Sequence, residues 1–243
     1  MKTMFTLKVN DSEDGVLKFG MPENDREMKE MFDFRYRVYC ERGYVSPSQS
    51  KSDVDEYDRN GCCQYFIAKM GDQIIGTMRQ IQNKALPIFN YFSFPDPGKE
   101  SGAPPANSCE IGRLIVSHKG AGCTGVLPRG LVSLFLMKCA AEYAKQNGIG
   151  LSYAFIKAKL ERKMRNRKMP LKYIRNYEQS CSPDDLLFDY FSNPKDPVHP
   201  VYFLTHEFDR YLKRIINRVF FEIKNGIEYR IRQNLMTKVL FGR

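Results

Sequence analysis

The segment Cys109–Val116 constrains the fold more than any other, because it has the composition of a core strand yet contains a carboxylate and a guanidinium. Strands seldom bury two charges without a use for them. In a regular strand Glu110 and Arg113 would point to opposite faces. A bulge at Gly112 would bring both to one face, so the sequence predicts a bulged strand that carries a polar site. A purely structural ion pair is the alternative.

The composition describes a chain that can bury one good core and prefers anionic partners. Its 243 residues are 42% hydrophobic and 13% aromatic, which predicts one domain with an appendage. The formal net charge is +10, and such an excess favours nucleic acid, a membrane surface, a phosphorylated cofactor or an acidic protein. A nucleic-acid-binding module therefore remains an alternative, although the sequence has no nucleic-acid motif to support it.

The cysteines and histidines argue against disulfides and metals. Seven cysteines, an odd number without a C-x-x-C pair, are typical of reduced core residues in a cytosolic protein. Three histidines without H-x-x-x-H spacing predict no metal site. No apolar run approaches the roughly 18 residues of a membrane-spanning helix. We therefore expect a cytoplasmic protein without a transmembrane segment or signal peptide.

The N-terminal part predicts a first strand or a hairpin, followed by a helix with an unusual arginine. Two β-prone pieces in residues 6–19 flank a polar turn, and Asn24 with Glu27 has the spacing of a capping box. In the helix that follows, Arg35 falls within the apolar stripe. An inward arginine needs an anion, either a protein carboxylate or a ligand carboxylate.

Further charged residues follow in the next loop and hairpin. Residues 44–60 form a polar loop that contains Asp55 and Asp58, for which a solvated acidic loop is the alternative interpretation. Runs 62–69 and 73–82 predict a hairpin, and Arg79 lies in the middle of its second strand.

The chain after the central strand predicts helices and strands in alternation. A glycine-bearing turn, 117–125, provides backbone N–H groups suited to a phosphate, and a core helix is expected over 127–147. A strand over 149–156 and a strongly basic helix over 157–168 follow. We expect a main domain over 1–206 and a basic amphipathic helical extension over 207–243. The aromatic loop 87–107 either lines an apolar pocket or packs against the sheet.

Four blocks of residues resemble the signature blocks of acyl-homoserine-lactone synthases, in the same order and at similar spacing. These are Phe34–Tyr39, Asp55–Asp58, Gly76–Arg79 and Glu110–Arg113. The order of predicted elements also resembles the GCN5-related N-acetyltransferase fold. The resemblance implies an α/β (α+β) architecture with a central mixed, mostly antiparallel sheet and a bulged central strand, flanked by helices.

The resemblance also implies roles for individual residues. Glu110 and Arg113 match the catalytic pair, with Glu110 as general base, and the matching substrate-binding positions are Arg35, Tyr39, Asp55, Asp58 and Arg79. On this interpretation donor binding involves the backbone of Leu114, Ile115 and Val116 and the glycine turn at Gly120 and Gly122. Cys109 alternates to the face opposite Glu110, which argues against an acyl-cysteine intermediate.

One departure selects between two related groups of enzymes. The lactone synthases have a tryptophan a few residues after the position of Tyr39, whereas this chain has no tryptophan. The sequence is more similar to the long-chain N-acyl amino acid synthases, which share the blocks. We therefore expect transfer of a fatty acyl group from acyl carrier protein to an amino acid such as tyrosine. The phosphopantetheine thioester is then a substrate, and no bound cofactor is expected.

Three other functions stay open from the sequence. These are an acyl-homoserine-lactone synthase that uses adenosylmethionine, a coenzyme-A-dependent acetyltransferase acting on a small amine, and the nucleic-acid-binding module. Coenzyme A also remains an alternative acyl donor. The backbone N–H groups of the turn 117–125 can bind its pyrophosphate as well as the phosphate of phosphopantetheine. The basic helix 157–168 favours the acidic carrier protein.

Overall fold

The protein forms two compact units that share the strand β6. The computed structural model describes residues 1–8, 16–44, 47, 52–82, 86–95, 97, 107–117, 130–183, 188–224 and 228–231. Unit 1 comprises Met1–Arg79, Arg113–Glu142 and Leu212–Arg243, and unit 2 comprises Gln80–Gly112 and Tyr143–Tyr211. The boundary therefore crosses β6 between Gly112 and Arg113.

Unit 1 is a sheet between two helices. Its elements are β1 (Lys2–Lys8), β2 (Val16–Met21), α1 (Asp25–Glu41), α2 (Glu56–Arg59), β3 (Cys63–Met70), most of β4 (Gln73–Ile81), the second part of β6 (Ser108–Val116), most of α5 (Leu131–Gln146), the end of α8 (Thr205–Val219), β11 (Phe220–Lys224) and β12 (Glu228–Ile231). The strand order is β11-β12-β1-β2-β3-β4, with β12 parallel to β1 and the β1–β2 and β2–β3 pairs antiparallel. The first strand or hairpin of the prediction is thus the hairpin β1–β2, and the strands of the second predicted hairpin, β3 and β4, are neighbours in the sheet.

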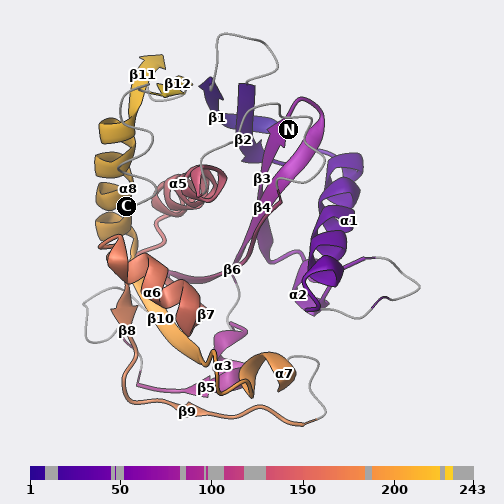
Figure 1. Cartoon of the computed structure of the whole chain (residues 1–243), viewed down its shortest axis with the longest axis vertical. Coiled ribbons are helices and arrows are strands. Elements are labelled where there is room, and N and C mark those ends of the chain that lie inside the picture. The colour runs from indigo at the N-terminus through magenta and orange to yellow at the C-terminus, as the bar shows by residue number, and fades with distance from the viewer. Residues whose placement is uncertain are drawn as a thin grey trace. The chain divides into compact units, whose positions relative to one another are not determined.

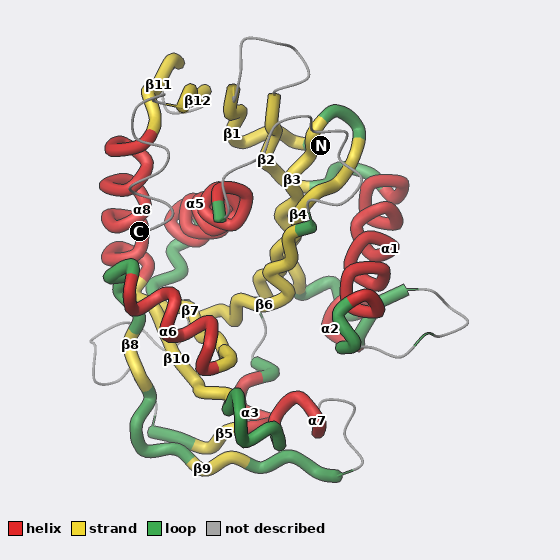
Figure 2. The backbone as a smooth tube through the Cα atoms, viewed as in Figure 1, coloured by secondary structure: helices red, strands yellow, loops and turns green. Residues whose placement is uncertain are grey.

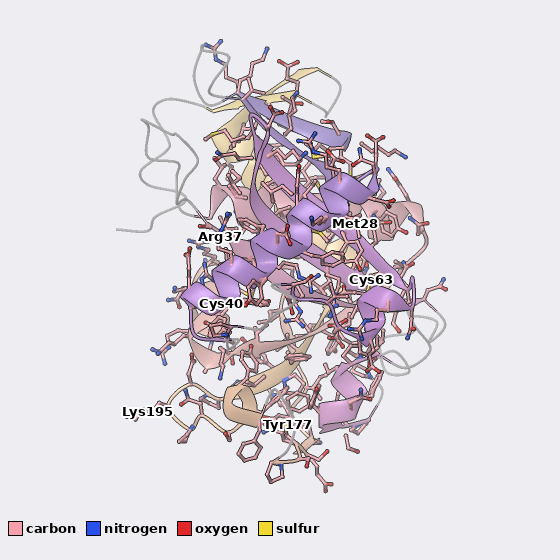
Figure 3. All side chains as sticks on the ribbon, turned by 90° about the vertical axis from the view of Figure 1, so that its right-hand side faces the viewer. Met28, Arg37, Cys40, Cys63, Tyr177 and Lys195 are labelled. Atoms are coloured by element: carbon pink, nitrogen blue, oxygen red, sulfur yellow. The ribbon has the colours of Figure 1, made fainter. Side chains whose placement is uncertain are left out.

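The helix α1 covers one face of this sheet, as the predicted apolar stripe requires. Its start has the expected cap, in which the Asn24 side chain accepts a hydrogen bond from the Glu27 N–H. Met31, Phe34 and Val38 pack with residues of β3 and β4, beside which α1 runs in Figure 1. Figure 3 looks onto this helix, on which Arg37 is exposed.

The helix α5 packs within unit 1 through an aromatic core. Phe135 of α5 stacks on Phe19 of β2 at 5.0 Å between ring centroids and meets Phe5 and Tyr229 edge-on. A Cβ added to Gly76 of β4 would come within 2.8 Å of a Val132 methyl carbon, so this strand and α5 approach closely. The predicted core helix is confirmed, although it is described only from Leu131 onward.

Unit 2 contains the remaining strands of the same ten-stranded sheet and a cluster of short elements beside them. Its elements are α3 (Ile88–Tyr91), β5 (Phe92–Ser93), the first part of β6, β7 (Leu151–Lys157), α6 (Ala158–Asn166), β8 (Lys172–Tyr173), β9 (Glu178–Gln179), α7 (Phe188–Phe191) and β10 (Val198–Leu204). The strand β6 pairs with β7 in parallel, whereas β7–β10 and β10–β8 are antiparallel. Figure 2 shows the short β5 and β9 near α3 and α7.

The aromatic loop packs largely against this sheet. Phe92 and Phe191 are buried, and Phe155 of β7 lies 5.4 Å from Phe191 between ring centroids. Tyr91 stacks on Phe191 at 4.6 Å. Phe89, in contrast, remains 46% exposed.

The C-terminal part differs from the predicted helical tail. The helix α8 ends at Val219, and the chain continues as β11 and β12, the latter paired with β1. The amphipathic pattern predicted helix, but backbone pairing with a strand more than 200 residues earlier decided the local structure. The division at residue 206 stays a prediction. No helix in the described part of the chain is both long enough and apolar enough to cross a membrane.

Gly20 provides a stability test of the β1–β2 pairing. A Cβ at this position would lie 2.0 Å from the carbonyl oxygen of Lys2, a backbone atom that the sheet holds in place. We expect Gly20→Ala to lower the free energy of unfolding by about 2 kcal/mol or more. Gly112→Ala is the matched control, because its Cβ would meet no atom within 4 Å, and we expect a change within about 1 kcal/mol. Urea denaturation measures both, and equal stabilities would contradict the role of Gly20.

Candidate active site

Strand β6 carries both predicted catalytic residues, and its irregular residue is Arg113. Arg113 has φ +53°, in the left-handed region that side-chain-bearing residues rarely adopt. The sequence predicted a bulge at Gly112, so the irregularity lies one residue later than expected. Contacts of the arginine side chain hold it in this conformation, which costs of order 1 kcal/mol.

Arg35 is fully buried and binds two aspartates of the loop after α1. Its Nε donates to Asp53 Oδ2 at 2.9 Å, and its Nη2 donates to Asp58 Oδ2 at 3.1 Å. The side chains of Arg35 and Asp58 both have 0% exposure. The anion that an inward arginine requires is therefore a pair of protein carboxylates.

The other two arginines bind the same loop. Arg79 Nη1 donates to Asp55 Oδ2 at 2.7 Å and to Asp58 Oδ1 at 2.9 Å. Arg113 Nη2 lies 3.2 Å from Asp55 Oδ2 and 3.5 Å from Asp53 Oδ1. Three guanidinium groups and three carboxylates thus form one network within unit 1, which we call the Arg–Asp network.

The helix α2 gives this loop its shape. Asp55 is its N-cap and accepts from the Asp58 N–H at 3.0 Å, while Asp58 accepts from the Asp55 N–H at 3.0 Å. This reciprocal capping box orients both carboxylates toward the arginines. The pattern Asp-x-x-Asp is thus structural as well as electrostatic, and the alternative of a solvated acidic loop is wrong for these two residues.

The electrostatics of the network centre on Asp58. Burial on its own would raise the pKa of Asp58, but the guanidinium groups of Arg35 and Arg79 hold the pKa well below its usual value near 3.8. The Tyr65 hydroxyl donates to Asp58 Oδ1 at 2.8 Å. Burial and this carboxylate raise the pKa of Tyr65, so the phenol stays protonated.

Tyr39 and Asp53 complete the surroundings of Arg113. The Arg113 guanidinium lies 5.3 Å from the centre of the Tyr39 ring, an arrangement that favours the cation. The sequence identified Tyr39 but missed Asp53. Because Asp53 belongs to an irregular loop, no periodicity marks it, and only its position two residues before Asp55 could have pointed to it.

Glu110 belongs to unit 2, where it is nearly inaccessible. Its side chain accepts a hydrogen bond from the Ile88 N–H at 2.6 Å, and the residue is 3% exposed. Glu110 pairs in register with Tyr153 of β7, and lateral neighbours in a sheet share a face. The β6–β7 register covers only Ser108–Glu110, while β7 continues to Lys157. Glu110 therefore lies at the point where the described pairing ends.

Cys109 points to the other face, as predicted. Its Sγ donates to Ser152 Oγ at 3.2 Å, and the residue packs with Ala144 and Ile149. Burial raises the pKa of Cys109 to about 12, so the group is a thiol rather than a thiolate at neutral pH. The thiolate is the nucleophilic form, and its suppression argues against covalent catalysis here.

The predicted donor-binding residues are only partly described. Leu114, Ile115 and Val116 form the end of β6, where Ile115 is buried and the Val116 carbonyl accepts from Arg42 at 2.8 Å. Gly120 and Gly122 lie outside the described residues. Among the described residues, no group of three or more His, Cys, Asp or Glu side chains could hold a metal ion.

Comparison with known proteins identifies the family. A sequence model of the N-acyl amino acid synthase FeeM family matches residues 30–161, more than half of the chain and all four charged blocks. The chain belongs to this family. It is therefore an N-acyltransferase. No curated protein sequence matches the chain.

Several solved structures have the same fold. A CoA-dependent acyl-homoserine lactone synthase, MesI, has a TM-score of 0.54 at 17% identity, with 84% of this chain and 91% of MesI covered. The lactone synthase LasI has a TM-score of 0.55 at 16% identity, with 81% and 93% covered. FeeM, an N-acyl amino acid synthase from uncultured soil microbes, has a TM-score of 0.50 at 14% identity, with 79% and 94% covered. The predicted fold class is thus confirmed.

Asp58→Asn tests the Arg–Asp network. The amide cannot neutralise two buried guanidinium groups, so we expect the free energy of unfolding at pH 7 to fall by about 3–5 kcal/mol. Because the folded-state pKa of Asp58 is lowered, its contribution is present above pH ~4 and is lost progressively at lower pH. Urea denaturation between pH 3 and 7 measures both effects.

Glu56→Gln is the matched control for this substitution. Glu56 also lies in α2 but is exposed, so we expect a change within about 0.5 kcal/mol. An Asp58→Asn protein as stable as this control would show that the network contributes little to folding.

Proposed function

We propose that the protein transfers a long-chain fatty acyl group from acyl carrier protein to the α-amine of an amino acid such as tyrosine. The observation that carries the proposal is Glu110, a buried carboxylate at the end of the β6–β7 pairing in a member of the N-acyl amino acid synthase family. A carboxylate in such a position suits a general base.

The chemistry requires an unprotonated amine next to a thioester. Glu110 removes a proton from the substrate ammonium, directly or through a water. The amine nitrogen then attacks the thioester carbonyl carbon, the C–N bond forms and the C–S bond breaks. The attacking nitrogen loses its second proton, and the departing thiolate on the phosphopantetheine arm takes up that proton. The hydrogen bond from the Ile88 N–H fixes the orientation of the carboxylate for this transfer.

The surroundings of Glu110 favour an aromatic acceptor. Tyr153 is its register partner, and Phe89 and Phe94 lie 5.5 and 5.9 Å from the Tyr153 ring between centroids. Phe89 follows Ile88, the residue that binds Glu110, and is 46% exposed. Partly exposed aromatic rings beside the base offer edge-to-face contacts to a tyrosine side chain.

Arg113 is the arginine best suited to bind the acceptor carboxylate. Its side chain is 22% exposed, against 0% for Arg35 and 7% for Arg79. Its contacts with aspartates, 3.2 and 3.5 Å, are also longer than the 2.7 Å contact of Arg79. The better-buried arginines then act as the supports that position it.

Glu110→Gln tests the catalytic proposal. We expect the rate of amide formation to fall by about 10²–10⁴-fold, with Tm nearly unchanged because the amide oxygen can still accept from Ile88. Cys109→Ala is the control, since its buried thiol takes no part, and it is expected to keep most of the activity.

The product identifies the reaction. Mass spectrometry of organic extracts from cells overexpressing the wild type is expected to show N-acyl amino acids differing by two-carbon units, absent from cells with Glu110→Gln. New acyl-homoserine lactones would contradict the proposed acceptor. A Glu110→Gln protein that melts far earlier would instead make Glu110 a structural residue.

The helix α6 provides a surface for an acidic carrier protein. Its exposed residues include a basic set, namely Lys159, Arg162, Lys163 and Arg165, followed by Arg167 and Lys168 after its end. Leu160 is 40% exposed among them, so the surface combines positive charge with an apolar contact. Lys157, which the sequence pattern includes in this set, is instead half-buried and donates to the Tyr190 carbonyl. Such a surface steers an acidic partner.

Charge reversal on α6 tests this docking. We expect the double variant Arg162→Glu, Lys163→Glu to slow association with acyl carrier protein about tenfold, and the effect to shrink as salt rises past 0.15 M, where the screening length is about 8 Å. Turnover of an acyl-pantetheine, which has no protein surface, is expected to stay the same. Stopped-flow binding and steady-state assays measure the two quantities.

The control has the same change in net charge elsewhere. Lys18 and Lys29 are exposed residues of unit 1, and their double reversal is expected to leave both measurements unchanged. An equal loss with both donors would place the α6 residues in the site itself, and a loss with neither would refute docking on α6.

A further inference from the structure

Two adjacent cysteines of unit 1, Cys62 and Cys63, direct their thiols to the same atom. Cys62 Sγ donates to the Tyr57 carbonyl oxygen at 3.4 Å, and Cys63 Sγ donates to the same oxygen at 3.2 Å. In a regular strand, adjacent side chains would point to opposite faces. Here Gly61 has φ +67° and β3 begins only at Cys63, so the turn before the strand brings both sulfurs to one side. The two thiols therefore form a close pair.

Both thiols are free and partly exposed, whereas Cys109 and Cys139 are buried. A dithiol whose sulfurs are both close together and accessible can be oxidised to a disulfide. Burial raises the pKa of Cys63 to about 12, so its thiolate is scarce at neutral pH. Cys62 precedes the strand and is the better first target of an oxidant.

The carbonyl that both thiols bind belongs to α2, the helix that shapes the Arg–Asp network. Tyr57 lies between Asp55, the N-cap of this helix, and Asp58, and the carboxylates of both aspartates bind Arg79. A short helix leaves its last carbonyl groups without partners inside the helix, and the thiols supply donors there. Arg79 and Asp58 also act on the pKa of Cys63, so this thiol lies close to the network. The dithiol is thus connected to the network through α2.

We propose that Cys62 and Cys63 form a redox modification site, at which hydrogen peroxide produces a disulfide that releases α2 and slows acyl transfer. The Cys62 sulfur first attacks one peroxide oxygen, the O–O bond breaks, and the departing hydroxide takes the thiol proton and leaves as water. Cys62 is thereby oxidised to a sulfenic acid. The Cys63 sulfur then attacks the Cys62 sulfur, the S–O bond breaks, and the second hydroxide leaves as water with the Cys63 proton.

The disulfide removes the contacts that the reduced pair makes with α2. Neither sulfur keeps a hydrogen, so the Tyr57 carbonyl loses both thiol donors. Consecutive Cα atoms are about 3.8 Å apart, whereas a disulfide usually spans about 4.4–6.8 Å between Cα atoms. The start of β3 must therefore shift to close the bond, and the shift reaches Asp55, which binds Arg113. A strained disulfide is also easily reduced, which makes the modification reversible.

Peroxide treatment of the purified protein tests the site. Peptide mapping by mass spectrometry is expected to show a Cys62–Cys63 peptide that is lighter by two hydrogen atoms. Turnover of an acyl-pantetheine is expected to fall about tenfold, since a small misplacement of binding groups can reduce a rate by as much as 10²-fold. Dithiothreitol is expected to restore the rate. Methionine oxidation, which this thiol does not reverse, is thereby distinguished from the disulfide.

Serine variants identify the sulfurs responsible. Cys62→Ser and Cys63→Ser are each expected to keep their turnover after the same treatment, because serine cannot form the disulfide although its hydroxyl can still donate to the Tyr57 carbonyl. Cys181→Ser is the matched control. Cys181 is also a partly exposed free thiol, but it belongs to unit 2. This variant is expected to stay as sensitive to peroxide as the wild type.

Thermal stability provides a second measurement, because the effect on turnover rests on the proposed function. The Tm of the oxidised wild type is expected to be lower by about 4 °C, to recover on reduction, and to stay unchanged in Cys62→Ser. If the wild type acylates no amino acid, the proposed function fails, and the Tm and the mapped disulfide still decide about the dithiol. Three outcomes would overturn the assignment. These are peroxide treatment without the disulfide, a disulfide that leaves Tm unchanged, and a Cys62→Ser protein as sensitive as the wild type.

Discussion

The ion pairs that Asp58 makes with Arg35 and Arg79 are the interaction on which unit 1 depends. Asp58 and Arg35 have fully buried side chains, and Arg79 is nearly so. An isolated charge at this depth would be prohibitively unfavourable, so each of these groups is tolerable only with the others in place. Arg35 belongs to α1 and Arg79 to β4. The Asp58 carboxylate therefore connects a helix and a strand to the loop that contains Asp58.

This arrangement determines what the remaining charges can do. The network holds Arg113 by Asp53 and Asp55, and the Tyr39 ring adds a further contact. These contacts stabilise a left-handed backbone at a residue other than glycine. The charged cluster is therefore a scaffold that shapes the second part of β6, and Arg113, its most exposed arginine, is the member that we propose binds the substrate. Three arginines without bound protein carboxylates would instead have offered three cations to a substrate.

The predictability of the site from sequence follows the regularity of the backbone. Arg35 and Arg79 could be found because helical and strand periodicity assign them to buried faces, where a cation requires a partner. Asp53 could not, since a loop has no period. The sequence places the irregular backbone of β6 at Gly112, because glycine adopts unusual backbone angles most readily. In the structure, tertiary contacts place it at Arg113 instead. Glycine can adopt a left-handed backbone without strain, but it has no side chain to hold that conformation. The arginine side chain makes contacts that compensate for the strain.

Long-range pairing limited the prediction of the fold in the same way. The helix α8 was predicted from amphipathic pattern, but its end at Val219 depends on β11 and β12 and on their pairing with β1, which no local signal reveals.

The central strand shows the opposite case. Alternation alone separates Cys109 from Glu110, and the structure adds the chemical consequence. Burial keeps the thiol of Cys109 protonated beside Ser152, whereas Glu110 is oriented by a backbone N–H on the opposite face. Two adjacent residues of one strand thus differ in the chemistry available to them: the protonated thiol of Cys109 is a poor nucleophile, and the carboxylate of Glu110 is the group that we propose as the base.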